Sequence, residues 1–106
     1  MAAVVDIPTD RGLMIPRAVA GTPDDVALFR DEAGAVHAID DTCTHTVASL
    51  ARGRVRGGCV TCPLHAAAYD LRTGEELSTS YLSPVRVHPV EVRDGQVYLA
   101  LDDGLK

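Results

Sequence analysis

The 106-residue sequence has no tryptophan, one phenylalanine and three tyrosines. Its core must therefore be built mainly from aliphatic side chains, which are plentiful because hydrophobic residues make up 46% of the chain. No apolar run approaches the roughly 20 residues that a membrane-spanning helix needs. The first ten residues, MAAVVDIPTD, have neither the basic start nor the apolar stretch of a signal peptide. These absences predict a globular cytoplasmic protein that does not engage a membrane.

Lysine is almost absent, since Lys106 is the only one, and the net charge is −5. A nucleic-acid binder would normally present a basic surface, so this balance argues against that class. One stretch, RGRVRGG, runs against the trend because it places Arg52, Arg54 and Arg56 within five residues. A solvated loop is the simpler interpretation of this stretch.

Sustained helical periodicity is also missing, and residues 46–53 could hold one helical turn at most. Short β-type runs alternate instead with turn signals about every ten residues. We predict an all-β fold: a small antiparallel β-sandwich or barrel formed by one domain over residues 1–106, with a loop-rich part at about residues 43–83. The strands before and after that part should pair with one another.

Two hairpins are predicted. The runs VALFR (26–30) and AVHAI (35–39) flank the loop DEAG, and near the carboxyl end Asp94-Gly95 favours a type I′ turn. A further turn is expected around residues 72–74. In VRVHPVEV the alternation of valines changes phase, which predicts a bulge or bend near His88-Pro89.

The three cysteines are few enough to be considered one by one. Two of them lie close to a histidine, in CTH and in CPLH, and sixteen residues separate the two motifs. The motifs contribute one thiolate and one imidazole each, from Cys43, His45, Cys62 and His65. In a reducing compartment such residues suggest metal binding or catalysis rather than a disulfide.

Three interpretations of this set are open. A structural zinc site is tetrahedral and closed, but its ligand pairs are usually alike in type, whereas each pair here is mixed. The four residues could instead be buried without any metal. The third interpretation is a [2Fe–2S] cluster in which two histidines replace two cysteines on one iron, and the mixed pairs suit that division.

With these motifs in view, the sequence resembles the small Rieske-type ferredoxins of bacterial ring-hydroxylating dioxygenase systems. The resemblance extends from about Asp25 to Leu101 and includes VALFRDEAGAVHAIDDTCTH, CPLH…YDLRTGE and SPVRVHPVEVRDGQVYL. It implies that residues 1–106 form one Rieske domain with its cluster-binding part at about 43–83. It further implies that Cys43 and Cys62 ligate the inner iron and His45 and His65 the outer iron.

The resemblance also implies a function. Such a protein carries single electrons from a flavin-dependent reductase to a terminal oxygenase, docks transiently near the cluster, and is not itself an enzyme. The arginines at 52, 54 and 56 would then steer an acidic partner. The alternatives are an accessory small subunit of a larger redox enzyme such as a nitrite reductase, and a zinc-stabilised interaction module.

Several positions depart from the family pattern. Ala48 and Leu64 stand where high-potential members have a disulfide, so that bridge cannot form. Ala66 and Ala67 replace a usual glycine and, in high-potential members, a serine, while Thr79-Ser80 stands where prolines are common. Tyr69 matches the high-potential members, and we expect its hydroxyl to donate to cluster sulfur unless it is only a packed core aromatic.

The remaining candidates are expected to be structural. Cys59 forms a C-x-x-C with Cys62, but without a βαβ pattern a small buried strand residue is the better interpretation. His37 and His88 lie in strand-like runs without a carboxylate at matching spacing. We therefore do not expect them to form a mononuclear iron site.

Overall fold

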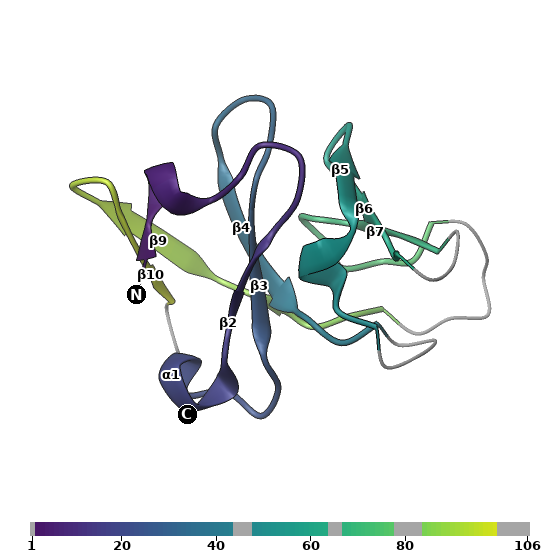
Figure 1. The fold of residues 1–106 in the computed structure, drawn as a ribbon, viewed down its shortest axis with the longest axis horizontal. Coiled ribbons are helices and arrows are strands. Elements are labelled where there is room, and N and C mark those ends of the chain that lie inside the picture. Colours follow the sequence, from purple (N-terminus) through teal and green to yellow (C-terminus); the bar gives the residue numbers. More distant parts are fainter. Residues whose placement is uncertain (1, 44–47, 64–66, 78–83, 100–106) are drawn as a thin grey trace.

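The computed structural model describes residues 2–43, 48–63, 67–77 and 84–99. Three antiparallel sheets make up this part of the chain. Figure 1 shows them side by side, with β9 and β10 on one flank, β2–β4 in the centre and β5–β7 on the other flank. The predicted all-β antiparallel fold is confirmed.

The central sheet has the order β2-β3-β4-β8, formed by Leu13–Ile15, Val26–Arg30, Val36–Asp40 and Val87–His88. Its strand β3 is buried on both faces: Val26 and Leu28 pack into one apolar cluster, and Ala27 and Phe29 into another. A strand with two covered faces needs continuous apolar sequence, which explains the run VALF. The central sheet therefore separates two cores.

The first core lies between the central sheet and the sheet β1-β10-β9, formed by Ala2–Ala3, Gln96–Leu99 and Val90–Arg93. A 3₁₀ turn, η1 (Val4–Asp6), and a single helical turn, α1 (Arg17–Ala20), border it. The buried members of this core are Ile7, Ile15, Ala20, Val26, Leu28, Ala38 and Val97.

The second core lies on the opposite face, beneath the sheet β5-β6-β7, formed by Arg54–Arg56, Cys59–Thr61 and Ala68–Asp70. It includes Phe29 from the central sheet, Val60 and Tyr69 from the third sheet, and Leu50 from the 3₁₀ turn η2 (Leu50–Arg52). The one helical turn expected within residues 46–53 is η2. This second core also holds Cys43 and Cys62, so it positions the candidate metal centre.

Most local predictions hold. Strands β3 and β4 form the expected hairpin. Asp94 and Gly95 have φ of 52° and 76°, as a type I′ turn requires. The irregularity expected near His88-Pro89 is a change of sheet: β8 pairs with β4, and after Pro89 strand β9 pairs with β10. The valine phase changes because the two strands face different neighbours.

One prediction was wrong. The arginine-rich stretch was expected to be a solvated loop, yet residues 54–56 form strand β5, which pairs with β6. The loop-rich part of the chain thus contains a sheet of its own. Arg54 and Arg56 point outward and are exposed, as expected of solvated charges, while Val55 between them packs against the second core. Among the described residues, no helix is long and apolar enough to cross a membrane.

Gly12 allows the segment before β2 to pack closely against η2 and β5. Its N–H donates to Ala51 O at 2.8 Å, and two residues earlier Asp10 O accepts from Val55 N at 3.0 Å. A Cβ at position 12 would lie 2.7 Å from the Phe29 ring and 3.0 Å from Ala51 Cα. The close approach therefore depends on glycine.

Gly12→Ala should lower the free energy of unfolding by about 1–3 kcal/mol, because the added methyl group overpacks a filled site. Urea unfolding followed by circular dichroism measures this. Ala33→Ser, in the exposed β3–β4 loop, serves as the control and should change stability by less than about 0.5 kcal/mol. Equal stability of the Gly12→Ala variant and the parent would show that this contact is loose.

Candidate metal centre

The two cysteines of the predicted ligand set are brought together by different sheets. Cys43 comes three residues after β4 ends, and Cys62 directly follows β6. Each is only 3% exposed, and both belong to the second core. Two thiols from segments far apart in sequence thus share one apolar environment.

The segments that begin at these cysteines close in the same way. Cys43 N donates to Ala48 O at 3.0 Å, and Cys62 N donates to Ala67 O at 2.8 Å. Each hydrogen bond spans five residues and ties the cysteine to the far end of its segment. His45 and His65 belong to these two segments but lie outside the described residues, as do Leu64, Ala66 and Thr79-Ser80.

Tyr69 contacts the sulfur of the first cysteine. Its hydroxyl oxygen lies 3.3 Å from Cys43 Sγ, and the whole residue is inaccessible to solvent in β7. If the sulfur is a thiolate ligand, the tyrosine O–H must be the donor. Tyr69 therefore packs in the core and contacts a cysteine sulfur, while the donation to cluster sulfur expected from the sequence stays a prediction.

Asp41 supports the end of the first segment. This carboxylate is only 5% exposed, and its Oδ1 accepts hydrogen bonds from Ser49 Oγ at 2.9 Å and Ala51 N at 2.8 Å. Its main-chain oxygen accepts from Leu50 N. The residues just before and just after the segment are thereby joined, a role that the sequence did not single out.

The second segment has a corresponding carboxylate. Glu76 Oε2 accepts from Ala68 N at 3.1 Å, and Leu77 N donates to Ala68 O at 2.7 Å. Asp70 organises the predicted turn at 72–74 by accepting from Arg72 N at 2.8 Å. Ala67 is buried, so a small side chain suits its position at the end of this segment.

Cys59 differs from the other two cysteines. It lies in β6, as predicted, but it is partly exposed rather than buried, and it forms no disulfide. Partial burial, followed by the negative charge of Asp70, raises the pKa of its thiol. A raised pKa lowers the fraction of thiolate, which is the nucleophilic and metal-binding form.

The other two histidines are held by carboxylates. His37 Nε2 lies 2.8 Å from Asp31 Oδ2, and His88 Nε2 lies 2.7 Å from Asp40 Oδ1. The hydrogen bond from His37 lowers the pKa of Asp31. In the part of the chain that the structure describes, no three Cys, His, Asp or Glu side chains are grouped as a metal site. The expectation that His37 and His88 are structural is consistent with these contacts.

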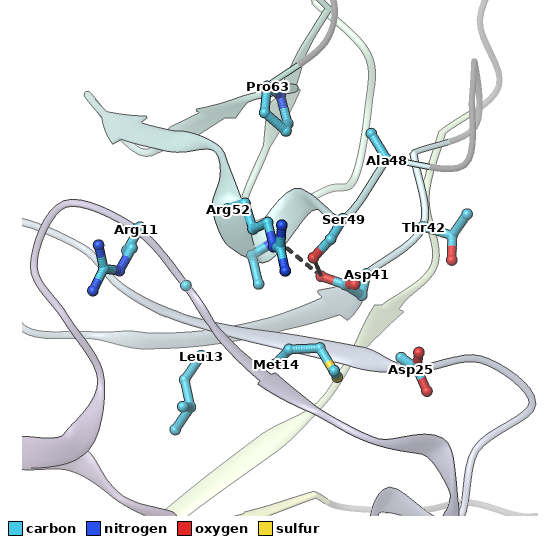
Figure 2. Close-up of a pocket in the computed structure, with 12 residues that line it drawn as sticks. Arg11, Leu13, Met14, Asp25, Asp41, Thr42, Ala48, Ser49, Arg52 and Pro63 are labelled. Atoms are coloured by element: carbon cyan, nitrogen blue, oxygen red, sulfur yellow. Dashed lines mark hydrogen bonds between the residues drawn. The ribbon is translucent and has the colours of Figure 1, made fainter.

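The cleft drawn in Figure 2 adjoins the candidate metal centre. It has a volume of about 710 Å³ and lies between β2, the end of β4 and η2. Ala48, which ends the first ligand-bearing segment, and Pro63, which lies within the second, both line it. Sequence reasoning missed this cleft because its walls come from five separate parts of the chain.

The comparisons with known proteins agree with the geometry of the site. A family model described as Rieske [2Fe-2S] domain matches residues 1–89. A 3-phenylpropionate/cinnamic acid dioxygenase ferredoxin subunit of Photorhabdus laumondii is 40% identical over 88 residues, which are 82% of each chain.

Two solved structures have the same fold over almost the whole chain. The ferredoxin in a complex of reduced oxygenase and oxidized ferredoxin of carbazole 1,9a-dioxygenase is 33% identical, with a TM-score of 0.81 and coverage of 94% of this chain and 98% of that one. A chain described as an NADH-dependent nitrite reductase small subunit of Mycobacterium tuberculosis is 27% identical, with a TM-score of 0.77 and coverage of 93% and 89%.

Asp41→Ala should lower the free energy of unfolding by about 2–4 kcal/mol, because the buried N–H of Ala51 and the hydroxyl of Ser49 both lose their charged acceptor. Asp41→Asn retains an acceptor oxygen and should cost about 1 kcal/mol or less. Chemical unfolding of both variants beside the parent measures the difference. Equal losses for Ala and Asn would mean that the charge, not the hydrogen-bond geometry, is what matters.

Proposed function

Because the chain belongs to the Rieske [2Fe–2S] domain family, whose model covers residues 1–89, we propose that it is a one-electron carrier of a ring-hydroxylating dioxygenase system. It would accept electrons from a flavin-dependent reductase and deliver them to a terminal oxygenase. The observation that carries the proposal is the pair of buried cysteines at the start of two equally closed segments. The similarity to dioxygenase ferredoxins supports the partner class.

The donor set fits the cofactor of this family. A Rieske cluster needs two thiolates on one iron and two imidazoles on the other, and a water-poor setting for the sulfurs. The second core supplies that setting for both described cysteines. The ligands would be Cys43, His45, Cys62 and His65. When bound, the cluster supplies one reversible electron-accepting site.

The protein's own residues set the conditions for electron transfer. The second core excludes water from the thiolates, and Tyr69 offers a hydroxyl donor to Cys43. A donor to sulfur stabilises the more negative, reduced state and so raises the reduction potential. Asp41 and Glu76 restrain the backbone beside the ligand segments, which limits rearrangement when charge changes.

Docking to each partner would be brief and use a small interface near the ligand segments. The proposed location is the cytoplasm, and neither a nucleic acid nor a membrane is a partner in this proposal. No substrate chemistry is assigned to the chain, so the identity of the oxidised substrate would reside in the oxygenase.

The second candidate is a small subunit held permanently in a larger redox enzyme, which the similarity to the M. tuberculosis chain favours. Size under native conditions distinguishes the two. A carrier should be recovered from its source cell as a small species separate from any large redox enzyme. A resident subunit should remain with its large partner through gel filtration at moderate salt.

The proposed function is tested by stoichiometric titration of the purified protein. It should contain two irons and two inorganic sulfides per chain. One electron equivalent of dithionite should bleach its visible absorption, and air should restore it. Colourless protein with one zinc per chain would favour the interaction module instead.

The cysteine assignment is tested by replacing each cysteine with serine. Cys43→Ser and Cys62→Ser should lose most of their iron and sulfide, because a neutral hydroxyl is a poor ligand compared with a thiolate. Cys59→Ser is the matched control and should retain the parent's iron content and visible spectrum. Loss of iron in the Cys59→Ser variant alone would overturn the assignment.

Tyr69→Phe should lower the reduction potential by roughly 20–60 mV, the equivalent for one electron of a hydrogen bond worth about 0.5–1.5 kcal/mol. Protein-film voltammetry measures the potential. Tyr98→Phe, which removes a hydroxyl from β10 in the sheet β1-β10-β9, should leave the potential unchanged. An identical potential for Tyr69→Phe and the parent would mean that the 3.3 Å contact does not act on the reduced state.

A further inference from the structure

An arginine from the amino-terminal part of the chain joins the arginine-rich stretch. Val55 N donates to Asp10 O and Gly12 N donates to Ala51 O. These two hydrogen bonds hold the segment on both sides of Arg11 against η2 and β5. The backbone at Arg11 is therefore held in place, and Arg11 and Arg52 both line the cleft in Figure 2. Arg11 and Arg52 are exposed, and their guanidinium groups make no ion pair or hydrogen bond with another described residue.

Among the described residues, the acidic residues of the cleft form no ion pair with these arginines. Asp41 is buried, and its Oδ1 already accepts from Ser49 and Ala51. Asp25 Oδ1 accepts from Arg17 N at 2.8 Å, and Figure 2 places Asp25 beyond Met14, away from the two arginines. The exposed charged residues that line the cleft are thus Arg11 and Arg52, in a chain whose net charge is −5.

The floor of the cleft is apolar and uncovered. On β2, Leu13 packs with the first core while Met14 points to the opposite face. That face is covered over β3 by the second core, but Met14 on the edge strand remains 44% exposed. An exposed methionine beside two unpaired arginines suits a chain segment that has both carboxylates and aliphatic groups.

We propose that this cleft is the docking site for an acidic segment of a protein electron-transfer partner, with its carboxylates held between Arg11 and Arg52. The inference rests on the proposed function, because a partner that approaches the ligand segments must also cover Ala48 and Pro63 on the wall of the cleft. A volume of about 710 Å³ exceeds what one small anion fills and falls within the range of sites for larger ligands.

The test uses a redox reagent of defined charge. The reduced protein gives one electron to hexacyanoferrate(III), which becomes hexacyanoferrate(II), and stopped-flow absorbance follows the reoxidation. Net charge alone predicts repulsion of this anion, so that added salt would accelerate the reaction. A positive cleft beside the ligand segments predicts attraction, so that salt slows the reaction, because at 0.1 M salt charges act over only about 10 Å.

The variant Arg11→Glu/Arg52→Glu should react about tenfold more slowly at low ionic strength and reverse the sign of the salt dependence. The control Arg72→Glu/Arg93→Glu makes the same change in net charge, from −5 to −9, since each substitution removes +1 and adds −1. Arg72 lines a different cleft with Asp31 and Glu32. Arg93 lies over the Tyr98 ring in the sheet β1-β10-β9. The control should keep the parent's salt dependence.

A peptide then identifies the occupant. Hexaglutamate should slow reoxidation of the parent and the control but not of the Arg11→Glu/Arg52→Glu variant, and hexalysine should slow none of them. Equal inhibition by free glutamate at the same carboxylate concentration would overturn the proposal in favour of a small-anion site. Equal behaviour of the two double variants would also overturn it. A protein that takes up no dithionite electrons would instead contradict the proposed function.

Discussion

The burial of two thiols in one apolar core is the constraint on which the structure depends. Cys43 and Cys62 come from two sheets that are not hydrogen-bonded to each other in any strand pair. They converge because β3 has two covered faces, so that Phe29 on its second face and Tyr69 of the third sheet share one core with both cysteines. Chain segments that begin at these cysteines then close through the same five-residue hydrogen bond. Packing thus holds the two cysteines of the candidate metal centre in one core.

Charge is distributed around that core in a consistent manner. Two carboxylates beside the ligand segments, those of Asp41 and Glu76, accept from main-chain N–H groups. Guanidinium groups face outward, where Arg11, Arg52, Arg54 and Arg56 are exposed. The inward acids restrain the backbone, and the outward bases are available to another molecule. In the function proposed, this division lets a small protein hold a cofactor rigidly and still present a charged surface for brief encounters.

Sequence reasoning predicted what local patterns encode. The β3–β4 hairpin, the Asp94-Gly95 turn and the interruption at Pro89 each follow from the residues at that place. It did not predict β5, because a strand of three residues with two outward arginines has a polar local sequence. That strand exists through long-range contacts, namely its pairing with β6 and the bond from Val55 N to Asp10 O. The same long-range bonds place Arg11, which no spacing rule in the sequence connects to Arg52.

The candidate site likewise has a part that the sequence predicts and a part that it does not. Both cysteines lie in the second core and the Tyr69 hydroxyl contacts Cys43, while ligation of iron by the cysteines stays a prediction. The support from Asp41 could not be predicted, because no local sequence pattern connects Asp41 with Ser49 and Ala51, which follow the first ligand-bearing segment. The imidazole ligands His45 and His65 stay a prediction.

Mössbauer spectroscopy of ⁵⁷Fe-labelled protein tests the central claim most directly, because it resolves the ligand environment of each iron. The account predicts two unequal iron sites in equal amounts, one with thiolate ligands and one with imidazole ligands. A single type of iron site, with thiolate ligation throughout, would contradict it.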